Sequence, residues 1–187
     1  MKSIFTRFLR IISDKRFVVT GAVLLLGIIR AGGVFAGTDA KADFNVDNAA
    51  PVVGEVVTVT DQSTAATNHR WSFGADANPV SSNAVGPHDV RYSTTGLKTI
   101  TLNVDAADGR GSSSEAKKSI PVYGTYYYKG SGSPSVRASW NSARDGNGDY
   151  TPVNFNSGYQ TFIIQTGQTC STSELWALTG PETKIVL

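Results

Sequence analysis

The stretch Leu97-Lys-Thr-Ile-Thr-Leu-Asn-Val104 decides the fold class of this chain. From Ile100 to Val104, apolar residues alternate with threonine and asparagine. Neighbouring side chains of a strand point to opposite faces of the sheet, so this period of two places one face on a core and the other in water. The stretch therefore predicts a β-strand in a sheet that is buried on one side.

Three other stretches alternate in the same way and are separated by Gly, Asn, Asp, Ser and Pro. They cover residues 55–60, 69–73 and 117–123. Beyond residue 40, no apolar residues recur at the 3.6-residue spacing of a helix. We therefore expect an all-β fold of the sandwich type. Pro121 predicts that the last strand lies at an edge, because proline cannot donate a ladder hydrogen bond.

Five short motifs occur here in a specific order and spacing: Gly54-x-x-Val57-x-Val59-x-Asp61-x-Ser63, Trp71-x-Phe73-Gly74, Tyr92-x-x-x-Gly96, Ile100-x-Leu102-x-Val104 and Gly109. This set resembles a PKD domain, the immunoglobulin-like module of bacterial surface proteins and of polycystin. The resemblance covers about residues 41–123 and implies an immunoglobulin-like β-sandwich. The sequence departs from the family at Gly74-Ala75-Asp76, where Gly-Asp-Gly is usual, and at Leu97, where an aromatic residue is common.

The marked residues of this domain have structural explanations. We expect Trp71 between the two sheets rather than on a sugar-binding surface. We expect the Tyr92 hydroxyl to bond the backbone near a strand start. Turn positions account for the remaining marked residues, which are Asp61, Ser63, Gly74, Gly96 and Gly109.

Residues 1–36 have the pattern of a secretory signal peptide. A basic start and an apolar run over residues 17–29 precede Val34-Phe35-Ala36, which has the small residues of a cleavage site. An uncleaved membrane anchor is the alternative, but Arg30 interrupts the apolar segment. We therefore expect a secreted or cell-surface protein, with residues 37–40 as a short linker and membrane contact only through an uncleaved leader.

The charge balance argues against a nucleic-acid partner. The chain holds 17 Lys and Arg and 15 Asp and Glu, but residues 1–36 contain six of the basic residues and one acidic residue. Residues 37–187 therefore hold 11 basic and 14 acidic residues, a net charge of −3. No basic patch remains of the kind that binds nucleic acid. Cys170 is the sole cysteine, so the chain can form no internal disulfide.

We expect residues 124–187 to form a second, smaller β-rich region. Two architectures are open for it, a sandwich and a solenoid. Its pattern of Trp140, Pro-x-Asn-Phe155, Gln-Thr-Phe-Ile-Ile164 and Thr-Lys-Ile-Val186 resembles β-rich modules that follow PKD domains in surface proteins of Bacteroidota. The chain stops at Leu187 inside an expected strand. We interpret this region as an incomplete module and expect an uncovered sheet edge.

Aromatic residues near the start of this region are candidates for a binding surface. Three consecutive tyrosines cannot all face inward, because neighbours in a strand alternate faces. Their partners would be glycans or proteins of a surface or matrix. The alternative, which we favour, is that the tyrosines lie in the joint between the two modules. The candidates are Tyr126, Tyr127, Tyr128, Trp140 and Tyr159.

A Gly-rich loop contains the one candidate metal site. Asp145, Asn147 and Asp149 place oxygen side chains at alternate positions, as calcium loops do. The helix-loop-helix calcium pattern requires Gly at position six and Glu at position twelve, where this chain has Tyr150 and Asn156. We therefore interpret the loop first as a turn between strands and only second as a calcium site. No other cofactor is expected.

The sequence lacks the constellations of catalytic residues. The two histidines, His69 and His88, lie far from Cys170, and no nucleophile elbow, zinc cluster or phosphate loop is present. We therefore expect no enzyme, but a non-catalytic extracellular module for adhesion or for interaction with proteins or carbohydrates. The alternatives are a structural spacer and an accessory region of a larger secreted hydrolase.

Overall fold

The computed structural model describes residues 36–172 and 174–187, and residues 37–187 form one compact unit. The predicted signal peptide lies outside the described residues, apart from Ala36. Within the described part, no helix has the length and apolar character needed to cross a membrane.

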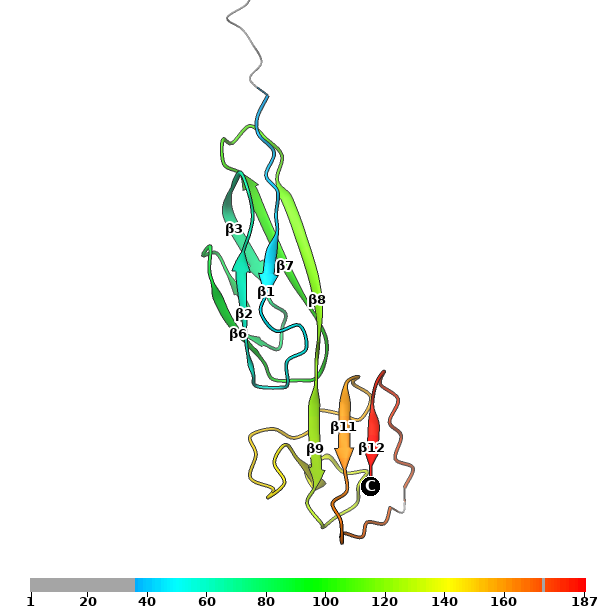
Figure 1. Cartoon of the computed structure of the whole chain (residues 1–187). Coiled ribbons are helices and arrows are strands. Elements are labelled where there is room, and N and C mark those ends of the chain that lie inside the picture. The colour runs from blue at the N-terminus through cyan, green and yellow to red at the C-terminus, as the bar shows by residue number, and fades with distance from the viewer. Residues whose placement is uncertain (1–35, 173) are drawn as a thin grey trace, which may run out of the picture. The chain divides into compact units, whose positions relative to one another are not determined.

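The first module is a sandwich of two antiparallel sheets (Figure 1). One sheet has the order β1-β2-β6-β4, with strands Phe44–Val46, Val56–Asp61, His88–Tyr92 and Ala77–Asn78. The other has the order β5-β3-β7-β8, with strands Ser81–Ser82, Ala66–Ser72, Gly96–Ala106 and Ser114–Val122. The expected all-β sandwich is confirmed, and β8, which contains Pro121, is an edge strand as predicted.

The core of the sandwich lies between the inner faces of the two sheets. Ile100, Leu102 and Val104 of β7 are fully buried, as their alternation predicts. Trp71 is 3% exposed, stacks on Phe73 and donates its indole N–H to the Ala84 carbonyl at 3.0 Å. The prediction of a core tryptophan is therefore confirmed.

One strand of this module was not predicted, and one expectation about a side chain is wrong. The segment from His88 forms β6, which pairs with β2 and buries Val90 and Tyr92. Gly86 and Pro87 directly before β6 hide the strand, because both are turn residues. The expected backbone bond of Tyr92 is absent, because its buried hydroxyl has no hydrogen-bond partner among the described residues. Packing in the core holds this side chain instead.

The turn assignments hold. Asp61 accepts hydrogen bonds from the backbone N–H of Ser63 at 3.1 Å and from its hydroxyl at 2.6 Å. Gly74, Gly96 and Gly109 all have positive φ. These local contacts close the turns that the sequence marks with small and polar residues.

The second module is a single four-stranded sheet in the order β10-β9-β11-β12. Its strands are Trp140–Asn141, Gly124–Tyr128, Gln160–Ile163 and Lys184–Val186, and a short 3₁₀ helix, Arg137–Ser139, precedes β10. β11 runs parallel to both β9 and β12, whereas β10 is antiparallel to β9. The register places Tyr126, Phe162 and Ile185 side by side across the three parallel strands.

Aromatic rings fill the core of the second module. Trp140 is completely buried, and its ring lies 4.9 Å from that of Phe162 and 5.3 Å from that of Trp176, centroid to centroid. At the edge strand β12, Ile185 is 43% exposed. Tyr126 and Phe162 are thus buried, whereas Ile185, which lies beside Phe162 on β12, is only partly covered. In the described part of this module the sheet is covered at its centre and open at the β12 edge.

Candidate functional site

Three of the five candidate surface residues are buried. Tyr126, Tyr128 and Trp140 are 2%, 2% and 0% exposed. The alternation of β9 turns Tyr126 and Tyr128 onto the core, which argues against a binding surface made of these rings. Tyr127 is half-buried, with the Arg144 guanidinium 5.1 Å from its ring centroid. Tyr159 is half-buried and packs edge-on against Tyr123, with 5.3 Å between centroids.

Backbone hydrogen bonds tie Tyr123, directly before the three tyrosines, to the sandwich. The Tyr123 N–H donates to the Pro51 carbonyl at 2.8 Å, and its carbonyl accepts from the Val53 N–H at 2.9 Å. The next residue, Gly124, donates to the Tyr159 carbonyl at 3.0 Å. A single residue, Tyr123, therefore connects β8 to β9. Tyr123 is bonded to the sandwich, and the next residue, Gly124, is bonded within the second module.

Hydrogen bonds from two polar side chains, those of Asn141 and Ser142, hold the loop that follows β10. The amide oxygen of Asn141, a buried residue, accepts from the N–H groups of Ala143 at 2.9 Å and Gly148 at 2.7 Å. Its amide nitrogen donates to the Gly148 carbonyl at 3.0 Å. The Ser142 hydroxyl accepts from the Tyr150 N–H at 3.1 Å. These bonds hold residues 143–150 in one conformation and fix the position of Tyr150.

Tyr150 closes over the backbone of Gly54. A Cβ atom on Gly54 would lie 2.6 Å from the Tyr150 hydroxyl oxygen and 2.7 Å from its Cε2. Gly54 also donates its N–H to the Tyr92 carbonyl at 2.9 Å and accepts from the Arg91 guanidinium at 2.7 Å. Gly54 is thus the point where the loop of the second module meets the sandwich, and only glycine leaves room for the ring.

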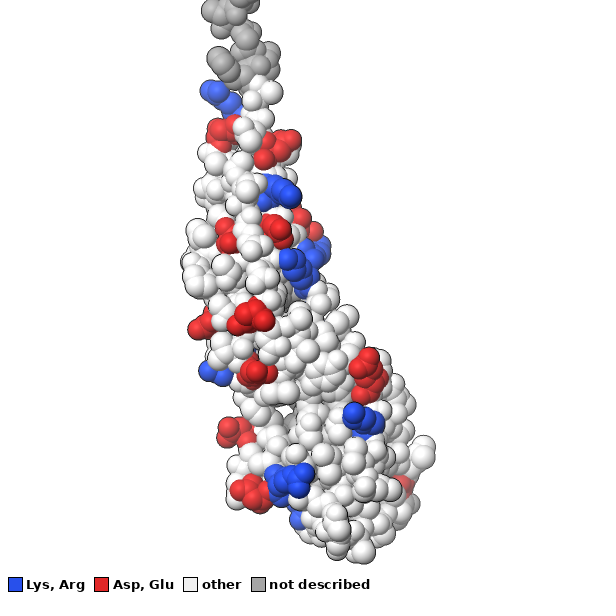
Figure 2. Space-filling view, in the orientation of Figure 1, with Lys and Arg blue, Asp and Glu red and all other residues white. Residues whose placement is uncertain are grey.

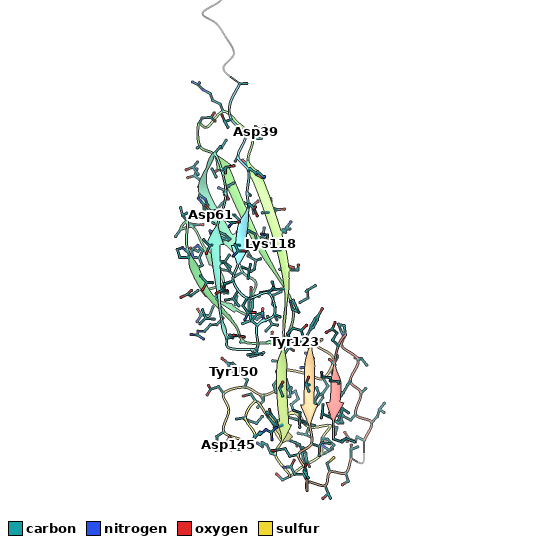
Figure 3. The ribbon with its side chains drawn as sticks, in the orientation of Figure 1. Asp39, Asp61, Lys118, Tyr123, Asp145 and Tyr150 are labelled. Carbon is teal, nitrogen blue, oxygen red and sulfur yellow. The ribbon has the colours of Figure 1, made fainter. Side chains whose placement is uncertain are left out.

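Two hollows flank Tyr150, and together we call them the joint cleft. Figure 3 shows Tyr150 on its loop beside the junction and Tyr123 where β8 leads into β9. The larger hollow has a volume of about 370 Å³, and its lining includes Val52, Tyr123, Ser142, Asp149 and Tyr150. The smaller has a volume of about 320 Å³, and its lining includes Asp76, Asn78, Arg91, Ser93 and Tyr150. Each volume lies within the range of about 300–1,000 Å³ that is usual for small-ligand sites.

The charges around the cleft differ between its two halves. Burial raises the pKa of Asp76, but hydrogen bonds from Lys98 and Thr94 outweigh it and hold the pKa below its ordinary value. Asp76 is therefore ionised and neutralised by Lys98. Asp149 is exposed, and the ion pairs within the described part of the chain involve other carboxylates. The larger hollow thus contains one unpaired carboxylate.

The polar clusters elsewhere in the sandwich have the wrong connectivity for nucleophilic catalysis. His69 Nε2 lies 3.0 Å from Asp61 Oδ2, but the Ser63 hydroxyl bonds the carboxylate rather than the imidazole. His88 Nε2 bonds the Ala84 carbonyl at 3.1 Å. A catalytic serine needs its hydroxyl on the base, so this arrangement fits a turn closure rather than an active site.

Sequence reasoning missed the joint cleft, although several of its lining residues were marked for other reasons. Tyr92 belonged to a fold motif, Tyr126 to the candidate binding surface and Asp149 to the candidate calcium set. Tyr150 received no role, because it appeared only as a residue that broke the calcium pattern. Its place immediately after a Gly-rich loop was the available signal, since such loops often present a side chain to a neighbouring element.

Substituting Gly54 with alanine should disturb the joint more than a surface change does. Gly54 has φ of +82°, and the new Cβ would collide with the Tyr150 ring. We expect a loss of about 1–3 kcal/mol in the free energy of unfolding, from backbone strain and overpacking. Denaturant unfolding measures it. Gly167→Ala is the matched control, because its φ is +82° and nothing lies within 4 Å of its Cβ position; equal losses in the two variants would show that the ring contact contributes nothing.

The loop of Asp145, Asn147 and Asp149 behaves as a turn around its first residue. Asp145 accepts from the Asn147 N–H at 3.0 Å, and this bond holds the Asp145 pKa below its ordinary value. The described residues contain no group of three or more His, Cys, Asp or Glu side chains placed to hold a metal. A strand, β10, begins at Trp140 before the loop, whereas residues 154–155 after it lie outside any strand. Calcium at the loop stays a hypothesis.

Calcium should leave the thermal stability of the protein unchanged. The Asp145 carboxylate already accepts a backbone bond, so the loop is closed without a cation. We expect the same Tm in excess calcium and in excess chelator, measured by circular dichroism. A rise of several degrees with calcium, abolished by Asp145→Ala, would instead establish a metal site.

Comparisons with known proteins return similarity of fold only. No family model and no curated protein matches the sequence. A carbohydrate-binding-module structure of the β-sandwich superfamily is similar at 22% identity and a TM-score of 0.41, over 48% of this chain and 37% of that one. The PKD1 domain of Epp from Vibrio anguillarum is similar at 20% identity and a TM-score of 0.37, over 46% of this chain and 95% of that one. The PKD1 domain of the metalloprotease PrtV from Vibrio cholerae is similar at 24% identity and a TM-score of 0.36, over 46% and 98%. The chain therefore spans just over a third of the carbohydrate-binding-module structure and nearly all of each PKD1 structure.

Proposed function

We propose that this chain is a non-catalytic, extracellular interaction module whose ligand site is the joint cleft. The single observation that carries the proposal is Tyr150, a half-buried ring that borders two hollows of ligand-sized volume. The apolar ring of a tyrosine can pack against a ligand while its hydroxyl forms hydrogen bonds with the ligand or with water, so tyrosine suits a binding surface that is in contact with solvent. Export through the predicted leader, a Bacteroidota-type surface location and adhesion to a surface or matrix belong to the same proposal.

The distribution of charge supports a partner other than nucleic acid. Figure 2 shows Lys and Arg interspersed with Asp and Glu on the face in view, rather than gathered into a basic stripe. Nucleic-acid binding depends on clustered cations that neutralise phosphates. The lining of the larger hollow instead combines tyrosines, hydroxyls and a carboxylate, and Arg91 is the one Lys or Arg in the lining of the smaller hollow.

A binding screen tests the proposal. The 187-residue chain is applied to an array of neutral glycans, acidic glycans and extracellular-matrix proteins, together with Tyr150→Ala. We expect at least one class of ligand to bind the native chain and to be lost in Tyr150→Ala. The matched control is Tyr127→Ala, which removes another half-buried tyrosine of the second module that does not line the cleft. Binding that survives Tyr150→Ala would place the site elsewhere.

A structural spacer is the second candidate, and the Tyr123 joint favours it. Tyr123 is hydrogen-bonded through both backbone groups to the sandwich, and β9 begins at the next residue. A joint without a linker transmits orientation between modules. Failure of every ligand class on the array would favour this function, or that of an accessory region of a larger secreted hydrolase, over the binding module.

A further inference from the structure

We propose that the joint cleft binds a neutral oligosaccharide, with one sugar ring against Tyr150 and its hydroxyl groups bonded to the Asp149 carboxylate. This inference rests on the proposed function and specifies the ligand of the same site. It follows from the shape, the charge and the backbone pairing of the cleft.

The shape of the cleft suits a short chain of units rather than a single compact ligand. The hollows of about 370 Å³ and 320 Å³ share Tyr150 as a common wall. A linear saccharide presents repeating rings, so consecutive units can occupy the two hollows on either side of this residue. Each sugar ring has an apolar face of C–H groups, which packs on an aromatic ring, and an edge of hydroxyls, which needs polar partners.

The polar groups of the larger hollow match hydroxyl donors. Asp149 supplies an exposed carboxylate without a cationic partner in the described residues, and the Ser142 side chain lies nearby in the same lining. A carboxylate that accepts from sugar hydroxyls makes charge-assisted hydrogen bonds, which are stronger than neutral ones. In the smaller hollow, Arg91 and Asn78 supply N–H donors for the acceptor oxygens of the next unit.

The charge of the larger hollow disfavours an acidic sugar. Its lining contains Asp149 but no Lys or Arg. A uronate or sulfate group there would meet a like charge and find no cation to compensate its loss of hydration. The ligand class that fits this half of the cleft is therefore neutral.

The backbone beside the cleft offers little room for an added peptide strand. β9 pairs with β11 over Gly124–Tyr127 but with β10 only at Tyr127 and Tyr128. At the joint, Tyr123 forms a parallel bridge with Val52. A peptide that binds by adding a strand needs an unpaired sheet edge. Among the described residues, the unpaired edge of β9 beside the cleft is limited to residues 124–126, so side-chain recognition of a saccharide fits the cleft better than recognition of an extended peptide.

Isothermal titration calorimetry of the 187-residue chain tests the inference. The probes are cellohexaose, xylohexaose, mannohexaose and chitohexaose, with heparin and polygalacturonate as acidic glycans. We expect one neutral probe to bind and Asp149→Asn to weaken it about tenfold, as loss of a charged acceptor implies. Asp145→Asn is the matched control, because it removes a carboxylate from the same loop outside the cleft lining, and should leave the affinity unchanged.

A second pair of variants separates stacking from folding. Tyr150→Phe keeps the ring and should bind within about threefold of the native chain, whereas Tyr150→Ala should lose at least about tenfold. Neutral-probe binding that is equal in native chain, Asp149→Asn and Tyr150→Ala would overturn the inference.

The remaining outcomes distinguish this inference from the proposed function. If only acidic glycans or matrix proteins bind and Tyr150→Ala abolishes their binding, the cleft is a ligand site but the neutral-saccharide inference is wrong. If no probe, acidic glycan or matrix protein binds, both the inference and the proposed function are wrong.

Discussion

Replacing Trp140 with alanine lowers the free energy of unfolding by about 3–5 kcal/mol, the usual cost of deleting a large buried aromatic side chain. Trp140 is completely buried, and its ring contacts those of Tyr128, Phe162 and Trp176 at centroid distances of 5.5, 4.9 and 5.3 Å. Its indole N–H donates to the Pro134 carbonyl at 2.8 Å, so the change also leaves that carbonyl without its partner.

The small size of the second core makes this loss severe. Its fully buried members are Tyr126, Tyr128, Trp140 and Phe162, and the chain has no disulfide to support them. We expect the near-ultraviolet circular dichroism of the packed aromatic rings to fall in Trp140→Ala, and urea unfolding to give the energy. Trp140→Phe is the control, because it keeps a ring in the core and should lose less. A cost below about 1 kcal/mol for Trp140→Ala would contradict the buried position.

Raising the pH above 10 destabilises the protein through two buried tyrosines. Burial raises the pKa of Tyr92 to about 12, and the neighbouring Asp76 charge adds to this effect. Burial also raises the pKa of Tyr126 to about 12, against a hydrogen bond with Gln160 that lowers it. Folding therefore favours the protonated form of both residues, while the unfolded chain ionises near the ordinary pKa of about 10.

The sign of the effect follows from this difference. The stabilising contribution is fully present below pH 10 and is lost as the pH rises from about 10 through 12, because the unfolded state releases protons that the folded state retains. Two pKa units correspond to roughly 2–3 kcal/mol for each tyrosine. Denaturant unfolding between pH 8 and 12 measures the loss, and a flat profile across this range would contradict it.

Tyr92→Phe isolates one half of the alkaline effect. The variant has no ionisable hydroxyl at this position, so its stability should fall less between pH 10 and 12. At pH 7 it should be as stable as the native chain, because the buried Tyr92 hydroxyl has no hydrogen-bond partner in the part of the chain that the structure describes. A clear loss at pH 7 would show that the hydroxyl does have a partner.

The strands with clean alternation could be predicted from sequence, and those without it could not. Ile100, Leu102 and Val104 identified β7 and its buried face, since the pattern is a property of neighbouring residues. β6 was missed because its five residues include His88, Asp89 and Arg91, and because glycine and proline precede it. Its place in the sheet comes from pairing with β2, a long-range contact.

The same distinction applies to the tyrosines of the second module. The rule of alternation correctly separates Tyr127 from Tyr126 and Tyr128. It does not say which face meets a core, because that depends on Phe162 and Trp140, which come from β11 and β10. A joint at these residues stays a prediction, and the backbone bonds to the sandwich lie at Tyr123, directly before them.

Local patterns in the chain were sufficient for the all-β class, the sandwich, the core tryptophan and the edge position of β8. These features depend on period, turn residues and the missing N–H of proline, all of which act over a few residues. The joint cleft depends on Gly54 and Tyr150, which lie far apart in the sequence and meet only after both modules have folded. No periodicity of the sequence connects two such residues. The candidate site could be identified only from the tertiary structure, in which a loop held by hydrogen bonds of Asn141 packs over the backbone of Gly54.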